Sequence, residues 1–221
     1  MKLARSVKSG AIVGTPLTNG SIDSALAQLL RQGRVGTITH VSLVDHRPNA
    51  GLSRDHVNYL QLRTAGIYAF ETLRRVLGVN PVNILARCTA APWHDQQHGT
   101  ITEAIVEMEG NIHVQYHGSL TSIGDEFALR IDGDRGVLRS SGRSIWWRKR
   151  GWPMFVPIWS TLPGRRLEQR QVGTDSEGSL WSVAMSEAAI ESDRTGRVVR
   201  VAAMLSEPGP VIPTTMAGRT R

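Results

Sequence analysis

Several short apolar segments in the middle of the chain are joined by tight turns, and this arrangement constrains the fold most. The predicted strands span residues 82–89, 100–108, 112–119, 126–132 and 137–139. Glu109-Gly110-Asn111 separates two of them and is short enough to predict a β-hairpin. Residues 144–148 and 154–159 are typical of a further strand pair. Consecutive strands linked in this way predict an open, mostly antiparallel sheet.

Helical segments flank these strands. Ile22, Leu26 and Leu30 fall on one face of a predicted helix that Gly33 ends. Two further helices are predicted over residues 61–77 and 179–192, and the β-branched residues of 37–46 predict a long strand. Residues 198–203 predict a final strand at the sheet edge. The predicted fold class is therefore α+β, with helices packed on one face of the sheet.

The two ends of the chain differ from its middle. Residues 11–14 form a short apolar run that predicts a buried strand, and residues 206–221 have the composition of a disordered tail. One α+β domain is expected between them, over residues 21–205. Within it, residues 47–59 lack a clear periodicity and predict a loop, where binding sites are often built.

Composition limits the class of protein. No apolar run approaches the roughly 18 residues of a membrane-spanning helix, and no secretory signal follows the basic N-terminus. Cys88 is the only cysteine, which excludes an internal disulfide and favours a cytoplasmic location. The net charge of +7 would suit nucleic acid, but the arginines are scattered, so nucleic-acid binding is the weaker alternative.

The sequence contains no glycine-rich loop for a dinucleotide. Such a site needs a strand, a Gly-x-Gly-x-x-Gly turn and a helix N-terminus, with an acid about 20 residues later. Gly10 and Gly14 flank the predicted first strand, but Pro16 follows instead of a helix start. We therefore expect this chain alone to bind no cofactor.

Three stretches, taken in order, resemble one known family. They are residues 29–38, residues 66–78 and residues 180–199, the last ending in Thr195-Gly196-Arg197-Val198-Val199. Gly133 and Gly136 lie in a hairpin that fits the same pattern. Over about residues 11–201 the chain resembles the Gfo/Idh/MocA oxidoreductases, the family of glucose–fructose oxidoreductase and inositol dehydrogenase.

The resemblance implies one half of a two-domain enzyme. Family members join a Rossmann domain, which binds NAD or NADP, to an α+β domain that binds substrate and often forms oligomer contacts through one sheet face. Residues 1–20 look like a remnant of the last Rossmann strand and its linker. The implied partners are a separate nucleotide-binding subunit, a sugar or polyol, and further copies of the chain.

The family's catalytic helix is altered in this sequence. Its usual pattern is an acid, Gly and His at alternate positions, then an acid three residues further on; here Thr64, Gly66, Tyr68 and Glu71 occupy those places. The family's Glu-Lys-Pro motif has no match. Tyr68 and Glu71 are therefore the catalytic candidates, although a phenol is a poor base at neutral pH.

A cluster of polar residues lies where the family binds polyol or anionic groups. These substrate-binding candidates are Arg47, Arg54, His56, Tyr59 and Arg63. Guanidinium groups there could bind a carboxylate or phosphate in a bidentate manner. The alternative is a set of solvated loop charges.

Two other groups of side chains suggest binding chemistry. His113 and His117 are four residues apart in a predicted strand and so share a sheet face, but the further ligands of a metal site are missing, so no metal is predicted. Trp146, Trp147 and Trp152 alternate with arginines, a pattern that suits base stacking but more often marks an edge hairpin buried in a subunit contact.

The leading hypothesis is a substrate-binding or oligomerisation domain of an NAD(P)-dependent oxidoreductase, inactive without a Rossmann subunit. The alternative from another class is a non-catalytic sugar-binding or scaffold protein, suggested by Thr64 and Tyr68.

Overall fold

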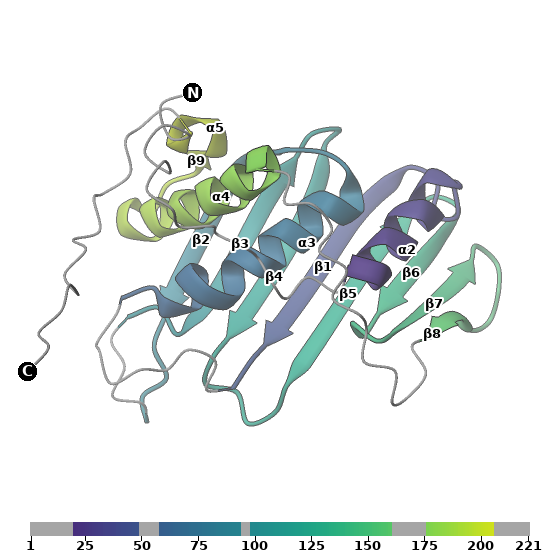
Figure 1. Ribbon diagram of the computed structural model, residues 1–221, viewed down its shortest axis with the longest axis horizontal. Coiled ribbons are helices and arrows are strands. Elements are labelled where there is room, and N and C mark those ends of the chain that lie inside the picture. The colour runs from purple at the N-terminus through teal and green to yellow at the C-terminus, as the bar shows by residue number, and fades with distance from the viewer. Residues whose placement is uncertain (1–19, 49–57, 94–97, 161–175, 206–221) are drawn as a thin grey trace, which may run out of the picture.

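A computed structural model of the chain describes residues 20–48, 58–93, 98–160 and 176–205, which form one sheet with a layer of helices against it (Figure 1). In chain order the elements are α2 (Gly20–Arg31), β1 (Ile38–His46), η1 (Leu62–Gly66), α3 (Ile67–Leu77), β2 (Pro81–Thr89), β3 (Ile101–Met108), β4 (Ile112–Ser119), β5 (Glu126–Gly133), β6 (Gly136–Ser140), β7 (Ser144–Lys149), β8 (Val156–Ser160), α4 (Ser176–Thr195), β9 (Val199–Arg200) and α5 (Val201–Met204). The predicted α+β class is confirmed.

The strands form one mixed sheet in the order β8-β7-β6-β5-β1-β4-β3-β2-β9. All neighbouring strands are antiparallel except β1 and β4, which run parallel from His40 beside His113 to His46 beside Ser119. The predicted open, mostly antiparallel sheet is therefore confirmed. The first strand of the described residues, β1, lies in the centre of the sheet, between β5 and β4.

The helices cover one face of the sheet, with α4 over β2 and α2 toward the β6–β7 side (Figure 1). Side chains on β1 alternate accordingly, since Val41, Leu43 and Asp45 are buried under the helices and the residues between them are half-exposed. Phe70 of α3 is fully buried and packs against Tyr116 of β4, with 5.1 Å between ring centroids. In the described part of the chain, no helix covers the opposite face, which we call the open face.

Local signals placed several turns correctly. Gly78 ends α3 in a left-handed conformation (φ 70°) and donates its N–H to the carbonyl of Arg74. Gly110 and Asn111, between β3 and β4, also have positive φ (77° and 58°), as a tight hairpin turn requires. The helix predicted over residues 61–77 begins with one π-helical turn, η1, and α4 is longer than predicted.

The predicted edge strand over residues 198–203 is wrong beyond its first residues. Only Val199 and Arg200 pair with β2, and α5 begins at Val201. Farther along β2, the N–H groups of Ala86 and Cys88 bind side chains at the end of α4 instead. Because these groups are already satisfied, a longer edge strand has no partners there.

Some expectations fall outside the described residues: the strand over 11–14, the Rossmann remnant in residues 1–19 and the tail over 206–221. Within the described segments, no helix is long and apolar enough to span a membrane.

The start of η1 meets β4 through a tight polar contact. Gln61 is fully buried, and its Nε2 donates to the hydroxyl of Tyr116 at 2.5 Å. Gly118 lies directly beside this pair, so a Cβ there would overlap both Gln61 Nε2 and the Tyr116 hydroxyl. The contact therefore requires glycine at position 118.

We predict that Gly118→Ala lowers the free energy of unfolding by about 1–3 kcal/mol, because the added methyl group overpacks a buried polar contact. Urea unfolding monitored by circular dichroism measures the change. Gly124→Ala is the matched control, since a Cβ at Gly124 has no atom within 4 Å and its φ is not positive. Equal stability of the Gly118→Ala variant and the unmodified chain would contradict the assignment.

Candidate functional site

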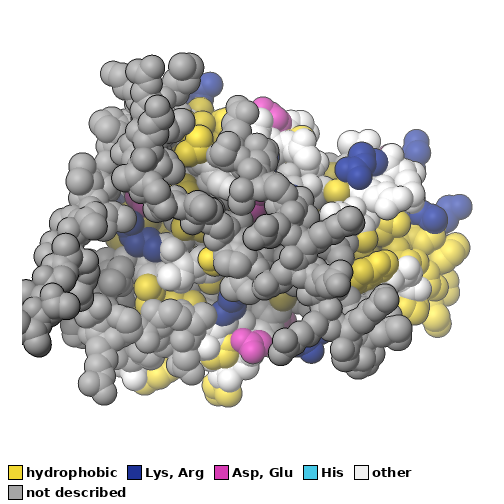
Figure 2. Space-filling view, viewed as in Figure 1, with side chains coloured by type: hydrophobic (Ala, Val, Ile, Leu, Met, Phe, Trp, Pro, Cys, Tyr) yellow, Lys and Arg dark blue, Asp and Glu magenta, His cyan; other side chains and the backbone are white. Residues whose placement is uncertain are grey.

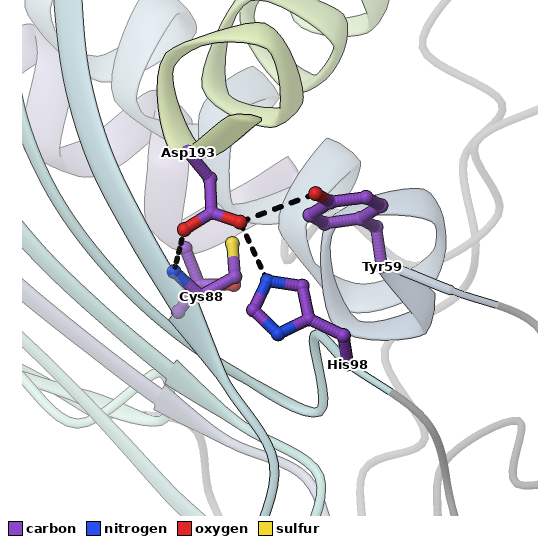
Figure 3. Close-up of polar contacts among 5 residues, drawn as sticks. Tyr59, Cys88, His98 and Asp193 are labelled. Atoms are coloured by element: carbon purple, nitrogen blue, oxygen red, sulfur yellow. Dashed lines mark hydrogen bonds and ion pairs between the residues drawn. The ribbon is translucent and has the colours of Figure 1, made fainter. Parts of the chain in front are cut away.

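Two side chains and one backbone N–H from distant parts of the chain converge on the carboxylate of Asp193 (Figure 3). His98 Nε2 lies 2.5 Å from Asp193 Oδ2, and the Tyr59 hydroxyl donates to the same oxygen at 3.2 Å. The other carboxylate oxygen, Oδ1, accepts the backbone N–H of Cys88 at 2.8 Å. We call Tyr59, His98 and Asp193 the carboxylate cluster.

Backbone contacts fix the two loop residues of the cluster. Tyr59 lies just before η1 and His98 just before β3, and the Tyr59 N–H donates to the carbonyl of His98 at 2.8 Å. Gln61 N–H donates to the carbonyl of Gly99 at 3.0 Å. A Cβ at Gly99 would lie 2.5 Å from Tyr59 Cα, so only glycine permits this approach.

The backbone at the cluster departs from regular geometry. Tyr59 has φ of 60°, a left-handed conformation that a bulky residue rarely adopts. The π-helical turn η1 follows three residues later, and such turns occur frequently at functional sites. Strained backbone of this kind is also common where side chains bind ligands.

The carboxylate of Asp193 remains ionised at neutral pH. Burial alone would raise the pKa of Asp193, but the hydrogen bonds from the Cys88 N–H, His98 and Tyr59 outweigh burial and hold the pKa below its usual value. Burial and the bond to Asp193 raise the pKa of Tyr59, so its phenol keeps its proton and donates.

This geometry sets the chemistry that His98 can perform. An ionised carboxylate only accepts hydrogen bonds, so His98 Nε2 carries the hydrogen, and in the neutral form of the ring the lone pair is on Nδ1. The His98 side chain is 45% exposed, whereas that of Asp193 is 5% exposed. A buried acid thus orients an accessible imidazole that can accept a proton or a hydrogen bond.

Cys88 adjoins the cluster but is not a nucleophile. It is buried, its Sγ lies 3.6 Å from the hydroxyl of Thr102, and burial raises the pKa of the thiol to about 11. The thiol therefore stays protonated at neutral pH.

The two catalytic candidates, Tyr68 and Glu71, lie on α3 and are not members of the carboxylate cluster. Glu71 is buried and accepts a hydrogen bond from Ser182 of α4 at 2.6 Å, with Arg74 at 3.4 Å. Its carboxylate thus joins α3 to α4. Tyr68 is half-exposed in the first turn of α3.

The predicted substrate-binding residues divide among several contacts. Tyr59 belongs to the carboxylate cluster, whereas Arg47 binds the buried carboxylate of Asp45 at 2.8 and 3.1 Å. Arg63 forms an ion pair with Glu187 at 3.2 Å. Arg54 and His56 lie outside the described residues.

Sequence reasoning missed two members of the cluster. The sequence predicts no role for His98, and Asp193 lies one residue beyond the helix predicted over 179–192. The two residues are 95 positions apart, and no motif links them. The local signal that could have drawn attention is Asp193 at the C-terminal turn of a helix, where the helix dipole disfavours an acid that lacks another partner.

An arginine from another part of the chain packs against the tryptophan-rich hairpin. Arg34 lies over Trp147 at 4.7 Å from the ring centroid, and Trp147 also packs against Trp152. Hydrophobic and basic side chains gather at the β7–β8 end of the molecule (Figure 2), where Trp152 and Met154 are exposed. Arg34 already covers one aromatic face that base stacking would need; the predicted subunit contact remains a prediction.

We predict that Asp193→Asn lowers the free energy of unfolding by about 1–3 kcal/mol at neutral pH, because it removes the charge that His98 and the Cys88 N–H bind. A carboxyl with a depressed pKa stabilises the fold above about pH 4, and this contribution is lost as pH falls through its folded pKa. Urea unfolding across a pH series should therefore show that the difference in free energy of unfolding between Asp193→Asn and the unmodified chain becomes smaller toward about pH 3.

Glu191→Gln is the control for this prediction. Glu191 is on the same helix, but its ion pair with Arg194 is exposed and 3.9 Å long. Its removal should change stability by about 0.5 kcal/mol or less. If Asp193→Asn loses the same free energy of unfolding at every pH, the charge of Asp193 is not the cause of that loss.

Similarity in fold to solved oxidoreductases is extensive. An NAD-binding oxidoreductase from Klebsiella pneumoniae matches 83% of this chain with a TM-score of 0.69 and 14% identity, covering 65% of that protein. An oxidoreductase from Agrobacterium radiobacter, solved with NAD+, L-tartaric acid and magnesium, matches 82% with a TM-score of 0.64 and 18% identity, covering 62%. An aldose–aldose oxidoreductase from Caulobacter crescentus, complexed with glycerol, matches 80% with a TM-score of 0.63 and 16% identity, covering 60%.

At these identities the similarity shows the fold alone, and this chain spans less than two thirds of the length of each of these proteins. A search of curated protein sequences found no match. The family model of the GFO/IDH/MocA C-terminal domain matches residues 24–139, just over half of the 221 residues. The chain therefore belongs to the GFO/IDH/MocA family and has the fold of its C-terminal domain.

Proposed function

We propose that these 221 residues are the substrate-binding and self-association half of an NAD(P)-dependent oxidoreductase that acts on a sugar, polyol or related hydroxy compound. One observation carries the proposal: the chain has the C-terminal-domain fold of its family, and its sequence lacks the Gly-x-Gly-x-x-Gly turn that holds a dinucleotide. The nicotinamide must then be held by a domain outside these residues, so this chain alone does not turn over.

The substrate class is supported by similar proteins. Their names include an aldose–aldose oxidoreductase and a levoglucosan dehydrogenase, and one was solved with L-tartaric acid. Each of these compounds carries hydroxyl groups. The carboxylate cluster offers what a hydroxyl group needs, namely an acceptor at His98 Nδ1 beside the phenol of Tyr59.

The cluster also supports a role in proton transfer. Oxidation of an alcohol requires a hydride acceptor, which the nicotinamide supplies, and an acceptor for the hydroxyl proton. We propose that His98 Nδ1 accepts that proton while Asp193 stabilises the imidazolium that forms. Asp193 is well placed for this because it is buried, ionised and within 2.5 Å of Nε2.

The candidates on α3 keep proposed roles in the same reaction. Tyr68 would donate a hydrogen bond to the substrate, and Glu71 would hold the helix in place through Ser182 of α4. Both roles derive from the positions that these residues occupy in the family pattern.

Self-association through the open face is the second part of the proposal. Leu85 and Ile105 are 40% and 52% exposed there, and they line a groove of about 630 Å³ across β1, β4, β3 and β2. Exposed apolar side chains gathered on one sheet face are typical of a protein contact. A second copy of the chain is the partner that the family suggests.

The alternative is a non-catalytic sugar-binding or scaffold protein. It is favoured by Thr64 and Tyr68, which stand where the family usually has an acid and a histidine. Turnover of a polyol or sugar when a nucleotide-binding subunit is added would exclude it. Nucleic-acid binding remains the weaker candidate.

We predict that His98→Gln weakens the binding of hydroxy compounds about tenfold or more, because it removes the acceptor at Nδ1 that the Asp193 carboxylate orients. Saturation-transfer NMR on the purified chain, with levoglucosan, D-glucose and L-tartrate as probes, measures binding. Tyr59→Phe should weaken binding to a smaller extent, since it removes one hydroxyl.

His113→Gln is the matched control, because His113 is exposed on β4 and lies outside the carboxylate cluster. Its binding should equal that of the unmodified chain. Saturation transfer that is unchanged in His98→Gln, or absent for all three probes, would contradict this site.

A further inference from the structure

A row of ionisable side chains crosses four adjacent strands on the open face. Glu126 of β5 lies 3.4 Å from His46 of β1, measured from Oε2 to Nδ1. His46 Nε2 in turn lies 2.8 Å from His117 Nδ1 on β4, and the two rings meet edge to face. Glu103 of β3 stands opposite His117 in the strand register.

The contact between the two rings limits how many protons the pair can hold. A nitrogen–nitrogen hydrogen bond needs one N–H and one lone pair, so only one of His46 Nε2 and His117 Nδ1 can carry a hydrogen. A single added proton is tolerated, because Glu126 and Glu103 stand at the two ends of the row. A second proton would place hydrogens on both facing nitrogens of two cations and break the bond.

We infer that the His46–His117 pair lets protons control the self-association of this chain: the pair is neutral or singly protonated in a face-to-face dimer, and a second proton separates the copies. The inference rests on the self-association proposed above and adds its regulation. The apolar groove reaches His117, so a copy seated on the groove would also cover the pair.

Charge on the open face favours a second copy as the occupant. Glu103 and Glu107 of β3 lie on one side of β1, and Arg139 of β6 lies on the other side, where Arg130 of β5 is already paired with Asp132 at 2.6 Å. Since β1 is the middle strand of nine, a two-fold axis along it would set β3 of each copy over β6 of the other. The acids on β3 of each copy would then face Arg139 of its partner.

The charged groups around the pair fix the sign of the pH effect. Burial and the neighbouring His46 lower the pKa of His117, while Glu103 and Glu126 act in the opposite direction and do not restore the usual value. Farther from the pair, Arg87 of β2 stands opposite Glu103 in the strand register and also lines the groove. Arg47 binds Asp45, and Asp125 lies close enough to raise the pKa of Asp45.

Association should lower the pKa of His117 further. A covering copy removes more water from the imidazoles, which disfavours their charged form further. A histidine whose pKa is depressed in the dimer takes its proton more readily in the free chain. Protons therefore bind preferentially to the separated copies, and the dimer weakens as pH falls through the lowered pKa that His117 has in the free chain.

The test is the mass of the whole chain in solution, measured by sedimentation equilibrium at about pH 8 and about pH 5. A monomer has a mass of 24.2 kDa. We expect a dimer at the higher pH, with a dissociation constant that rises about tenfold or more at the lower pH and recovers on return. His117→Gln, which cannot take the second proton, should remain a dimer at both values.

His113→Gln is the control on the same strand, and it should keep the pH response of the unmodified chain. A dimer of equal strength at both pH values would overturn proton control and leave self-association intact. A monomer at both would overturn self-association itself. A His117→Gln dimer that still dissociates at about pH 5, with unchanged circular dichroism, would show that another group is the sensor.

Discussion

The structure depends on the end of α4, whose side chains complete the edge of the sheet. Beyond the two residues that β9 contributes, Ser192 and Asp193 accept the N–H groups of Ala86 and Cys88, as a neighbouring strand would. Asp193 uses its second oxygen for His98 and Tyr59. One buried carboxylate therefore fixes the helix to the sheet and positions the only described imidazole that binds a buried acid. Stability and the candidate site are linked through this group, since the charge that stabilises the edge also orients His98.

The parts of the fold that follow from local chemistry were predictable from sequence. Gly78 and the turn at Gly110-Asn111 required positive φ, and these positions ended a helix and joined a hairpin as expected. The parallel pairing of β1 with β4 was not visible, because it brings together segments separated by an intervening helix and two strands. The carboxylate cluster was missed for the same reason. The strand predicted over residues 198–203 was wrong since periodicity cannot show that Ser192 and Asp193 already occupy the edge of β2.

The two faces of the sheet differ in the chemistry that they present. The helix-covered side holds the carboxylate cluster near the start of η1, where the backbone is strained and tightly packed. The open face carries apolar side chains, opposed charges and a histidine pair, which suit a contact with another copy. Under the proposed function, the helix-covered side binds the substrate and the open face binds a second copy of the chain. The altered positions Thr64 and Tyr68 make the placement of the proton acceptor a question for this particular chain.

We propose that this chain binds a hydroxy compound but supplies no site for the nicotinamide dinucleotide. Isothermal titration calorimetry of the purified chain with NAD+, NADH, NADP+ and NADPH tests it most directly. We expect no binding heat with any of the four dinucleotides. Saturable binding of one of them at micromolar concentration would contradict it, because it would require a pyrophosphate site that no glycine-rich turn in the sequence provides.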